Sequence, residues 1–170
     1  MRYHYLKCKK VINLYRNPFD CLVSNYYYFY KNRNIDLEIS KYIDYYMPKY
    51  IHSFIIIDKF KNKKNIMNIS YEELIKNTES TIKKILLFLN LEINKDLIRI
   101  AISDSSMDNL QLEEKKNNLK NLISNDVNIS FIRNRSLKSN INELSHSDIE
   151  KIKKYLNKSN ILFKENNFKI

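Results

Sequence analysis

The chain contains no glycine at all, and this absence limits the kinds of site that it can form. Glycine normally makes up about 7% of a protein. It is also the residue that adopts left-handed backbone conformations without steric cost. Phosphate-binding loops of the GxGxxG and GxxxxGK[ST] types both require it. The sequence therefore excludes every phosphate cradle that is built on glycine.

Length and composition predict one globular domain over residues 1–170, because 44% of the residues are hydrophobic and can form a core. No signal peptide and no apolar run of about 18 residues is found. The two cysteines, Cys8 and Cys21, then indicate a reduced, cytoplasmic protein with buried thiols. Three histidines and two cysteines at unrelated spacings predict no metal site.

The formal net charge of +11 suggests an anionic partner, such as a nucleic acid, a membrane surface or a phosphorylated small molecule. Only six of the 30 basic residues are arginine, and the chain has 24 asparagines, as an A·T-rich coding sequence would produce. We interpret the scattered lysines as solvated surface, so each arginine is of more interest. A basic nucleic-acid-binding module stays an alternative, but no recognised motif supports it.

Strands separated by helices predict a helix-rich α/β fold with a parallel sheet. Residues 9–15 form a short β-branched run typical of a buried strand. Asn17 is a good helix N-cap and Pro18 a good first helical residue. The other expected elements are a helix over 40–59 bent at Pro48, a strand over 65–70, helices within 71–91, 94–103, 105–116 and 144–156, and a loop over 117–142. Two capping boxes, Ser145 with Asp148 and Ser147 with Glu150, overlap at the start of the last helix.

Arg16 is predicted to lie at the carboxyl end of the first strand, where open α/β sheets bind their ligands. Ser24 follows about two turns into the next helix. A guanidinium and a hydroxyl could form a compact clamp for one phosphate. The alternative is that Arg16 pairs with Asp20 and that Ser24 is simply a small helical residue.

The segment KVINLYRNPFDCLVSNYYYFY, residues 10–30, resembles the 3′-phosphate-binding segment of the PAPS-dependent sulfotransferases. Those enzymes transfer a sulfuryl group from 3′-phosphoadenosine-5′-phosphosulfate (PAPS) to a hydroxyl or amine and release adenosine 3′,5′-bisphosphate (PAP). The matching residues are Arg16, Asn17, Pro18, Asp20, Val23, Ser24 and Tyr26. The resemblance implies that Arg16 and Ser24 bind the 3′-phosphate in a P-loop NTPase-like fold.

Three later segments, residues 69–93, 101–116 and 131–152, resemble the family in the same order. The resemblance places Tyr71, Ser105, Ser106 and Met107 around the adenine, with Met107 where the family has phenylalanine. It places Arg133 beside the 3′-phosphate. Arg135 replaces a family glycine, and its guanidinium could compensate for the lysine that Asn134 replaces. The alternative is that Arg135 points to solvent.

The family's first strand and its glycine-containing loop, which binds the 5′-phosphosulfate, have no counterpart in this sequence. We therefore expect part of a sulfotransferase domain, which transfers a sulfuryl group from PAPS to a hydroxyl or amine, and we expect this chain alone to bind PAP without that transfer. The alternative is a remnant that binds PAP and has no catalytic role. His4 is the candidate catalytic base, and the acceptor cannot be read from the sequence. An exposed sheet edge would favour self-association.

Overall fold

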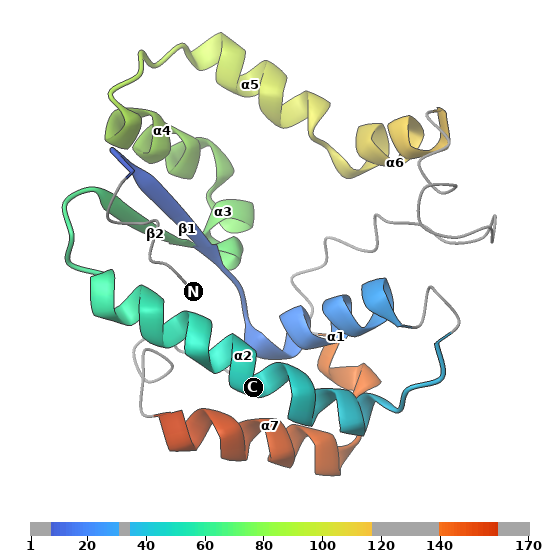
Figure 1. Cartoon of the computed structure of the whole chain (residues 1–170). Coiled ribbons are helices and arrows are strands. Elements are labelled where there is room, and N and C mark those ends of the chain that lie inside the picture. Colours follow the sequence, from blue (N-terminus) through green and yellow to red (C-terminus); the bar gives the residue numbers. More distant parts are fainter. Residues whose placement is uncertain (1–7, 31–34, 117–139, 160–170) are drawn as a thin grey trace.

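The computed structural model describes residues 8–30, 35–116 and 140–159. Figure 1 shows a helix-rich chain around a small sheet. Its elements in chain order are β1 (Val11–Tyr15), α1 (Pro18–Phe29), α2 (Ile39–Phe60), β2 (Ile66–Ser70), α3 (Tyr71–Lys76), α4 (Thr78–Leu89), α5 (Lys95–Asp104), α6 (Met107–Lys116), the 3₁₀ helix η4 (Asn140–Glu143) and α7 (His146–Ser159). The predicted α/β class is confirmed.

The two strands pair in parallel, in a register that runs from Val11 opposite Ile66 to Tyr15 opposite Ser70. Within the described residues the sheet consists of these two strands. Midway along the pair, the Asn13 side-chain amide donates a hydrogen bond of 2.9 Å to the Asn68 side chain. Because the strands are parallel, the turns that follow them leave the sheet at the same edge.

The predicted start of α1 is confirmed. The Asn17 side chain accepts a hydrogen bond of 2.9 Å from the Phe19 backbone N–H, and Pro18 is the first helical residue. The long helix α2 includes Pro48, whose side chain is exposed. At the end of α4, Asn90 adopts a left-handed conformation, with φ of 61°. Asparagine here takes the place that glycine fills in most proteins.

The first of the two predicted capping boxes forms at the start of α7. Ser145 Oγ accepts the Asp148 backbone N–H at 3.2 Å, and Asp148 Oδ2 accepts the Ser145 backbone N–H at the same distance. The second box is wrong, because Ser147 already lies inside the helix and Glu150 pairs with Lys153 at 2.9 Å. The expected loop over 117–142 ends in η4, and residues 117–139 lie outside the described part of the chain.

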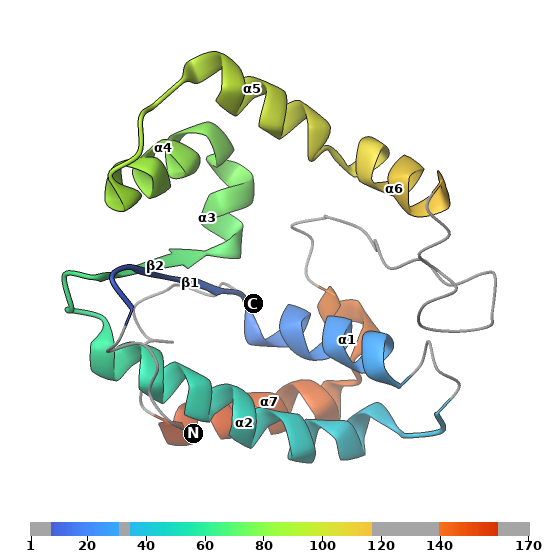
Figure 2. The ribbon, with the colours of Figure 1, turned by 45° about the horizontal axis from the view of Figure 1, so that its top comes forward.

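The core lies on one side of the sheet. Figures 1 and 2 show α1, α2 and α7 on this side, and α3 to α6 on the other. Its buried residues are Phe19, Leu22, Val23, Tyr42, Ile43, Met47, Tyr50, Phe54, Leu144 and Ile152. A smaller cluster of Ile56, Phe60 and Ile66 joins the end of α2 to β2. The core therefore anchors α1, which begins two residues after Arg16.

Leu22→Ala should lower the free energy of unfolding by about 2–5 kcal/mol, because its side chain is fully buried and truncation leaves a cavity. Leu87→Ala is the matched control, since Leu87 is 62% exposed. Urea denaturation followed by circular dichroism measures both changes. Equal losses of unfolding free energy in the two variants would contradict the burial of Leu22 in the core.

Candidate functional site

The residues that follow β1 contact the residues that follow β2. The guanidinium carbon of Arg16 lies 4.4 Å from the centre of the Tyr71 ring, as in a cation–π contact. Next to this pair, the Asn17 backbone N–H donates a hydrogen bond of 3.0 Å to Glu72 Oε1. The parallel pairing of Tyr15 with Ser70 explains both contacts, because it brings the residues that follow the two strands together at the carboxyl end of the sheet.

The backbone of Arg16 is held from the core side. Its carbonyl oxygen accepts a hydrogen bond of 2.5 Å from the Tyr50 hydroxyl of α2, and the Cys21 thiol lies 3.9 Å from the same oxygen. The Nε atom of Arg16 and the Oε2 atom of Glu72 are buried, and neither has a hydrogen-bond partner within the described residues. Such unmet groups are costly, at about 1–3 kcal/mol each. Arg16 as a whole is only partly buried, so the rest of its guanidinium can still face a ligand.

Cys21 lies beside this site but is not a reactive thiol. Burial raises its pKa to about 12, against the opposing effect of the nearby Arg16 charge. The thiolate is the nucleophilic form, so Cys21 stays protonated and inert near neutral pH. Cys8 is exposed, and the expectation of buried thiols is wrong for it. Cys8 precedes β1, where its carbonyl accepts a hydrogen bond from the Asn65 side chain.

The remaining predicted site residues fall into two groups, those that the structure describes and those that lie outside the described residues. Ser24 is exposed on α1, one residue after the buried Val23. Ser105 and Ser106 form the turn between α5 and α6, and Met107 is the first residue of α6. Ser106 Oγ accepts the Asn109 backbone N–H at 3.4 Å.

His4, Arg133 and Arg135 lie outside the described residues. The structure brings Arg16 and Tyr71 together, and the roles of all these residues stay predictions.

Sequence reasoning missed Glu72 and Tyr50 as supports of the Arg16 turn. Glu72 occurs within the Tyr-Glu-Glu run after β2, but its partner is 55 residues away, so no local pattern indicates the contact. Within the described residues there is no cluster of three or more metal-ligating side chains. None of the described helices has the length and apolar character needed to cross a membrane.

The family described as "Sulfotransferase domain" matches residues 4–164. The chain belongs to this family. An amine sulfotransferase of Oryctolagus cuniculus is 26% identical over 128 residues, which cover 69% of this chain and 42% of the relative. A 3-beta-hydroxysteroid sulfotransferase of Cavia porcellus is 31% identical over 128 residues, which cover 69% of this chain and 43% of that relative. The chain thus spans about two fifths of these sulfotransferases.

Solved sulfotransferase structures share the fold. Mouse sulfotransferase SULT7A1 complexed with PAP matches with a TM-score of 0.75 and 21% identity, over 93% of this chain and 61% of that structure. Retinol dehydratase in complex with androsterone and PAP matches with the same TM-score and 15% identity, over 94% of this chain and 49% of that one. These matches confirm the predicted sulfotransferase fold.

Glu72→Ala should lower the free energy of unfolding by about 1–3 kcal/mol, because the Asn17 backbone N–H loses its acceptor. Glu72→Gln should lose less, since it keeps an acceptor oxygen and removes a charge whose second oxygen has no partner. Glu92→Ala, at an exposed position after α4, is the control and should change stability by less than about 0.5 kcal/mol. If Glu72→Ala behaves like the control in urea denaturation, the Glu72–Asn17 contact does not hold the turn.

Proposed function

We propose that this chain binds the PAPS donor and its PAP product, with Arg16 and Ser24 on the 3′-phosphate, as part of a domain that transfers a sulfuryl group to a hydroxyl or amine. The observation that carries the proposal is the partly exposed Arg16 guanidinium at the carboxyl end of β1, beside Tyr71. Anionic ligands of open α/β sheets bind at such an edge.

The local geometry suits a phosphate. A guanidinium presents planar donors that match phosphate oxygens, and the Tyr71 ring and the fixed backbone limit where Arg16 can move. The amino end of α1 begins beside it, and helix amino ends favour negative charge. Ser24, on the exposed part of α1, would add one hydroxyl donor.

The wider site follows the family resemblance. Tyr71, Ser105, Ser106 and Met107 would surround the adenine, and Arg133 and Arg135 would assist at the 3′-phosphate. PAP in the complexes of the similar structures supports this class of ligand. We further propose one domain over residues 1–170 that needs no metal for binding.

The chemistry of transfer requires more than binding. The acceptor oxygen or nitrogen forms a bond to sulfur, the bond from sulfur to the 5′-phosphate oxygen breaks, and PAP leaves with that oxygen. A base takes the acceptor proton, and His4 is the candidate within this chain. The acceptor itself is not assigned.

Arg16→Ala should weaken PAP binding by roughly 1.5–3 kcal/mol, or about 10- to 150-fold, because it removes charged hydrogen bonds. Ser24→Ala should cost less. Arg99→Ala is the control, because Arg99 is an exposed residue of α5 that pairs with Asp96 at 3.7 Å. Isothermal titration calorimetry with PAP measures all three.

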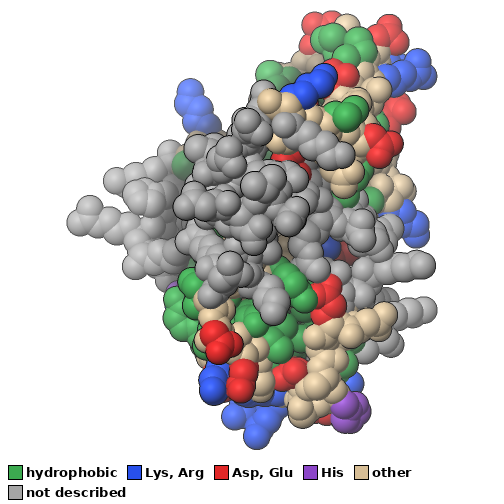
Figure 3. Space-filling view, turned by 90° about the vertical axis from the view of Figure 1, so that its right-hand side faces the viewer, with side chains coloured by type: hydrophobic (Ala, Val, Ile, Leu, Met, Phe, Trp, Pro, Cys, Tyr) green, Lys and Arg blue, Asp and Glu red, His purple; other side chains and the backbone are tan. Residues whose placement is uncertain are grey.

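If both Arg16→Ala and Ser24→Ala bind PAP like the parent, the phosphate clamp is wrong. The alternative, in which Arg16 pairs with Asp20 at the start of the helix, then gains support. The nucleic-acid alternative makes a different prediction, namely binding to nonspecific DNA that falls steeply with salt. Basic side chains are scattered over the face shown in Figure 3 and form no stripe on its described residues.

The 170 residues on their own should bind PAP without sulfuryl transfer, because they contain no glycine-based loop for the 5′-phosphosulfate. Losing even one preorganised donor typically lowers a rate by about 10²–10³. A labelled PAPS donor with a panel of hydroxyl and amine acceptors tests this expectation. Turnover that Arg16→Ala abolishes would contradict it and would show that other residues supply the donors.

A further inference from the structure

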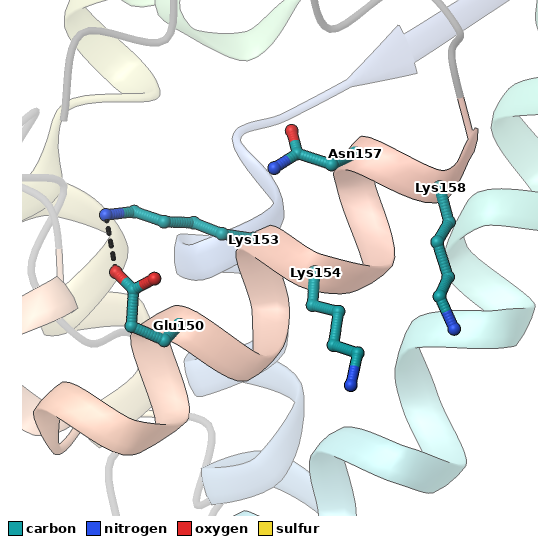
Figure 4. Close-up of a pocket in the computed structure, with 5 residues that line it drawn as sticks. All are labelled: Glu150, Lys153, Lys154, Asn157 and Lys158. Carbon is teal, nitrogen blue, oxygen red and sulfur yellow. Dashed lines mark hydrogen bonds and ion pairs between the residues drawn. The ribbon is translucent and has the colours of Figure 1, made fainter.

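Helix α7 carries two adjoining, open surface cavities that are lined by lysines. The larger, of about 410 Å³, is lined by Glu150, Lys153, Lys154, Asn157 and Lys158. Figure 4 shows how these five side chains project from the helix. The smaller, of about 210 Å³, is lined by Asp44, Lys151, Lys154, Tyr155 and Lys158. Lys154 and Lys158 line both cavities, so they lie where the two meet.

Two of the four lysines are already neutralised. Lys151 pairs with Asp44 of α2 at 2.7 Å, and Lys153 pairs with Glu150 at 2.9 Å. Lys154 and Lys158 are exposed and form no hydrogen bond or ion pair within the described chain. The site therefore holds two uncompensated positive charges one helical turn apart, which matches the charge of a dianion.

The lysine site is separate from the Arg16 site. Figures 1 and 2 both show α7 against α2, on the side away from α3, which begins at Tyr71. The Lys151–Asp44 ion pair and a hydrogen bond of 3.0 Å from Lys151 Nζ to the Ser40 carbonyl join α7 to α2. These contacts fix the helix on which Lys154 and Lys158 stand, so their separation does not depend on a ligand.

We propose that Lys154 and Lys158 form a second anion site, which binds a phosphate monoester dianion. Lysine binds phosphate as a compact point charge, and Figure 4 shows the Lys154 and Lys158 side chains projecting to the same side of α7, away from the Asn157 amide. The phosphate can belong to a free small molecule or to a lipid headgroup such as phosphatidic acid. The negative end of the α7 dipole lies near Lys158, so the affinity is modest.

The test compares the parent with Lys154→Gln/Lys158→Gln. The matched control is Lys63→Gln/Lys64→Gln, which removes the same charge at exposed positions between α2 and β2. Inorganic phosphate is titrated at constant ionic strength without PAP, because PAP itself carries two phosphate monoester groups. Amide chemical shifts of α7 report binding at the lysine site, separately from binding at Arg16. Chloride is the reference anion. Urea denaturation checks that each variant folds like the parent.

Each lysine should contribute about fivefold to the dissociation constant, so the double variant should bind phosphate about 25-fold more weakly. The control should change less than twofold. The proposal is overturned if the double variant binds like the parent, if the control loses as much, or if phosphate and chloride give equal shifts.

Vesicles identify the source of the phosphate. Phosphatidylcholine vesicles with and without phosphatidic acid are sedimented with the parent and both variants. Binding that needs phosphatidic acid and both lysines supports a lipid headgroup as ligand. Phosphate binding without vesicle binding supports a free phosphate monoester. The absence of both overturns the proposal.

Discussion

The parallel pairing of β1 with β2 is the interaction on which the candidate site depends. It places Tyr15 opposite Ser70, so that the two chain segments leave the sheet together. Arg16 and Tyr71 then stack, and Glu72 accepts the Asn17 backbone N–H. A shift of the register would separate all of these contacts, since each belongs to a residue fixed by its own strand.

Packing of α1 against α2 also holds the Arg16 turn in place. Phe19, Leu22 and Val23 bury one face of α1 against α2. The Tyr50 hydroxyl of α2 also holds the Arg16 carbonyl. The core therefore fixes the backbone of a residue whose side chain is available to a ligand, and preorganisation of this kind lowers the cost of binding.

The absence of glycine has a visible consequence in the fold. Asn90 takes the left-handed position at the end of α4, and asparagine tolerates it because its short polar side chain bonds locally. A glycine-based loop has no such substitute, because there the backbone itself must approach the ligand. At the Arg16 site, an arginine and the amino end of α1 are the groups available to an anion.

The sequence alone determined the features whose signals lie within one turn of the chain. Asn17 and Pro18 predicted the start of α1, and Ser145 with Asp148 predicted the start of α7. Both depend on neighbours that are close in sequence. The sulfotransferase fold was predicted in another way, from the resemblance of four segments to the family and from their order along the chain.

The tertiary structure decided the rest. The contact between Glu72 and Asn17 spans 55 residues, and the pairing of Lys151 with Asp44 joins two helices from opposite ends of the chain. Such long-range contacts depend on how the whole chain packs, and no local pattern of residues predicts them.

The predicted capping box of Ser147 with Glu150 is wrong for a local reason. A helix has one N-cap, and Ser145 occupies that position in α7.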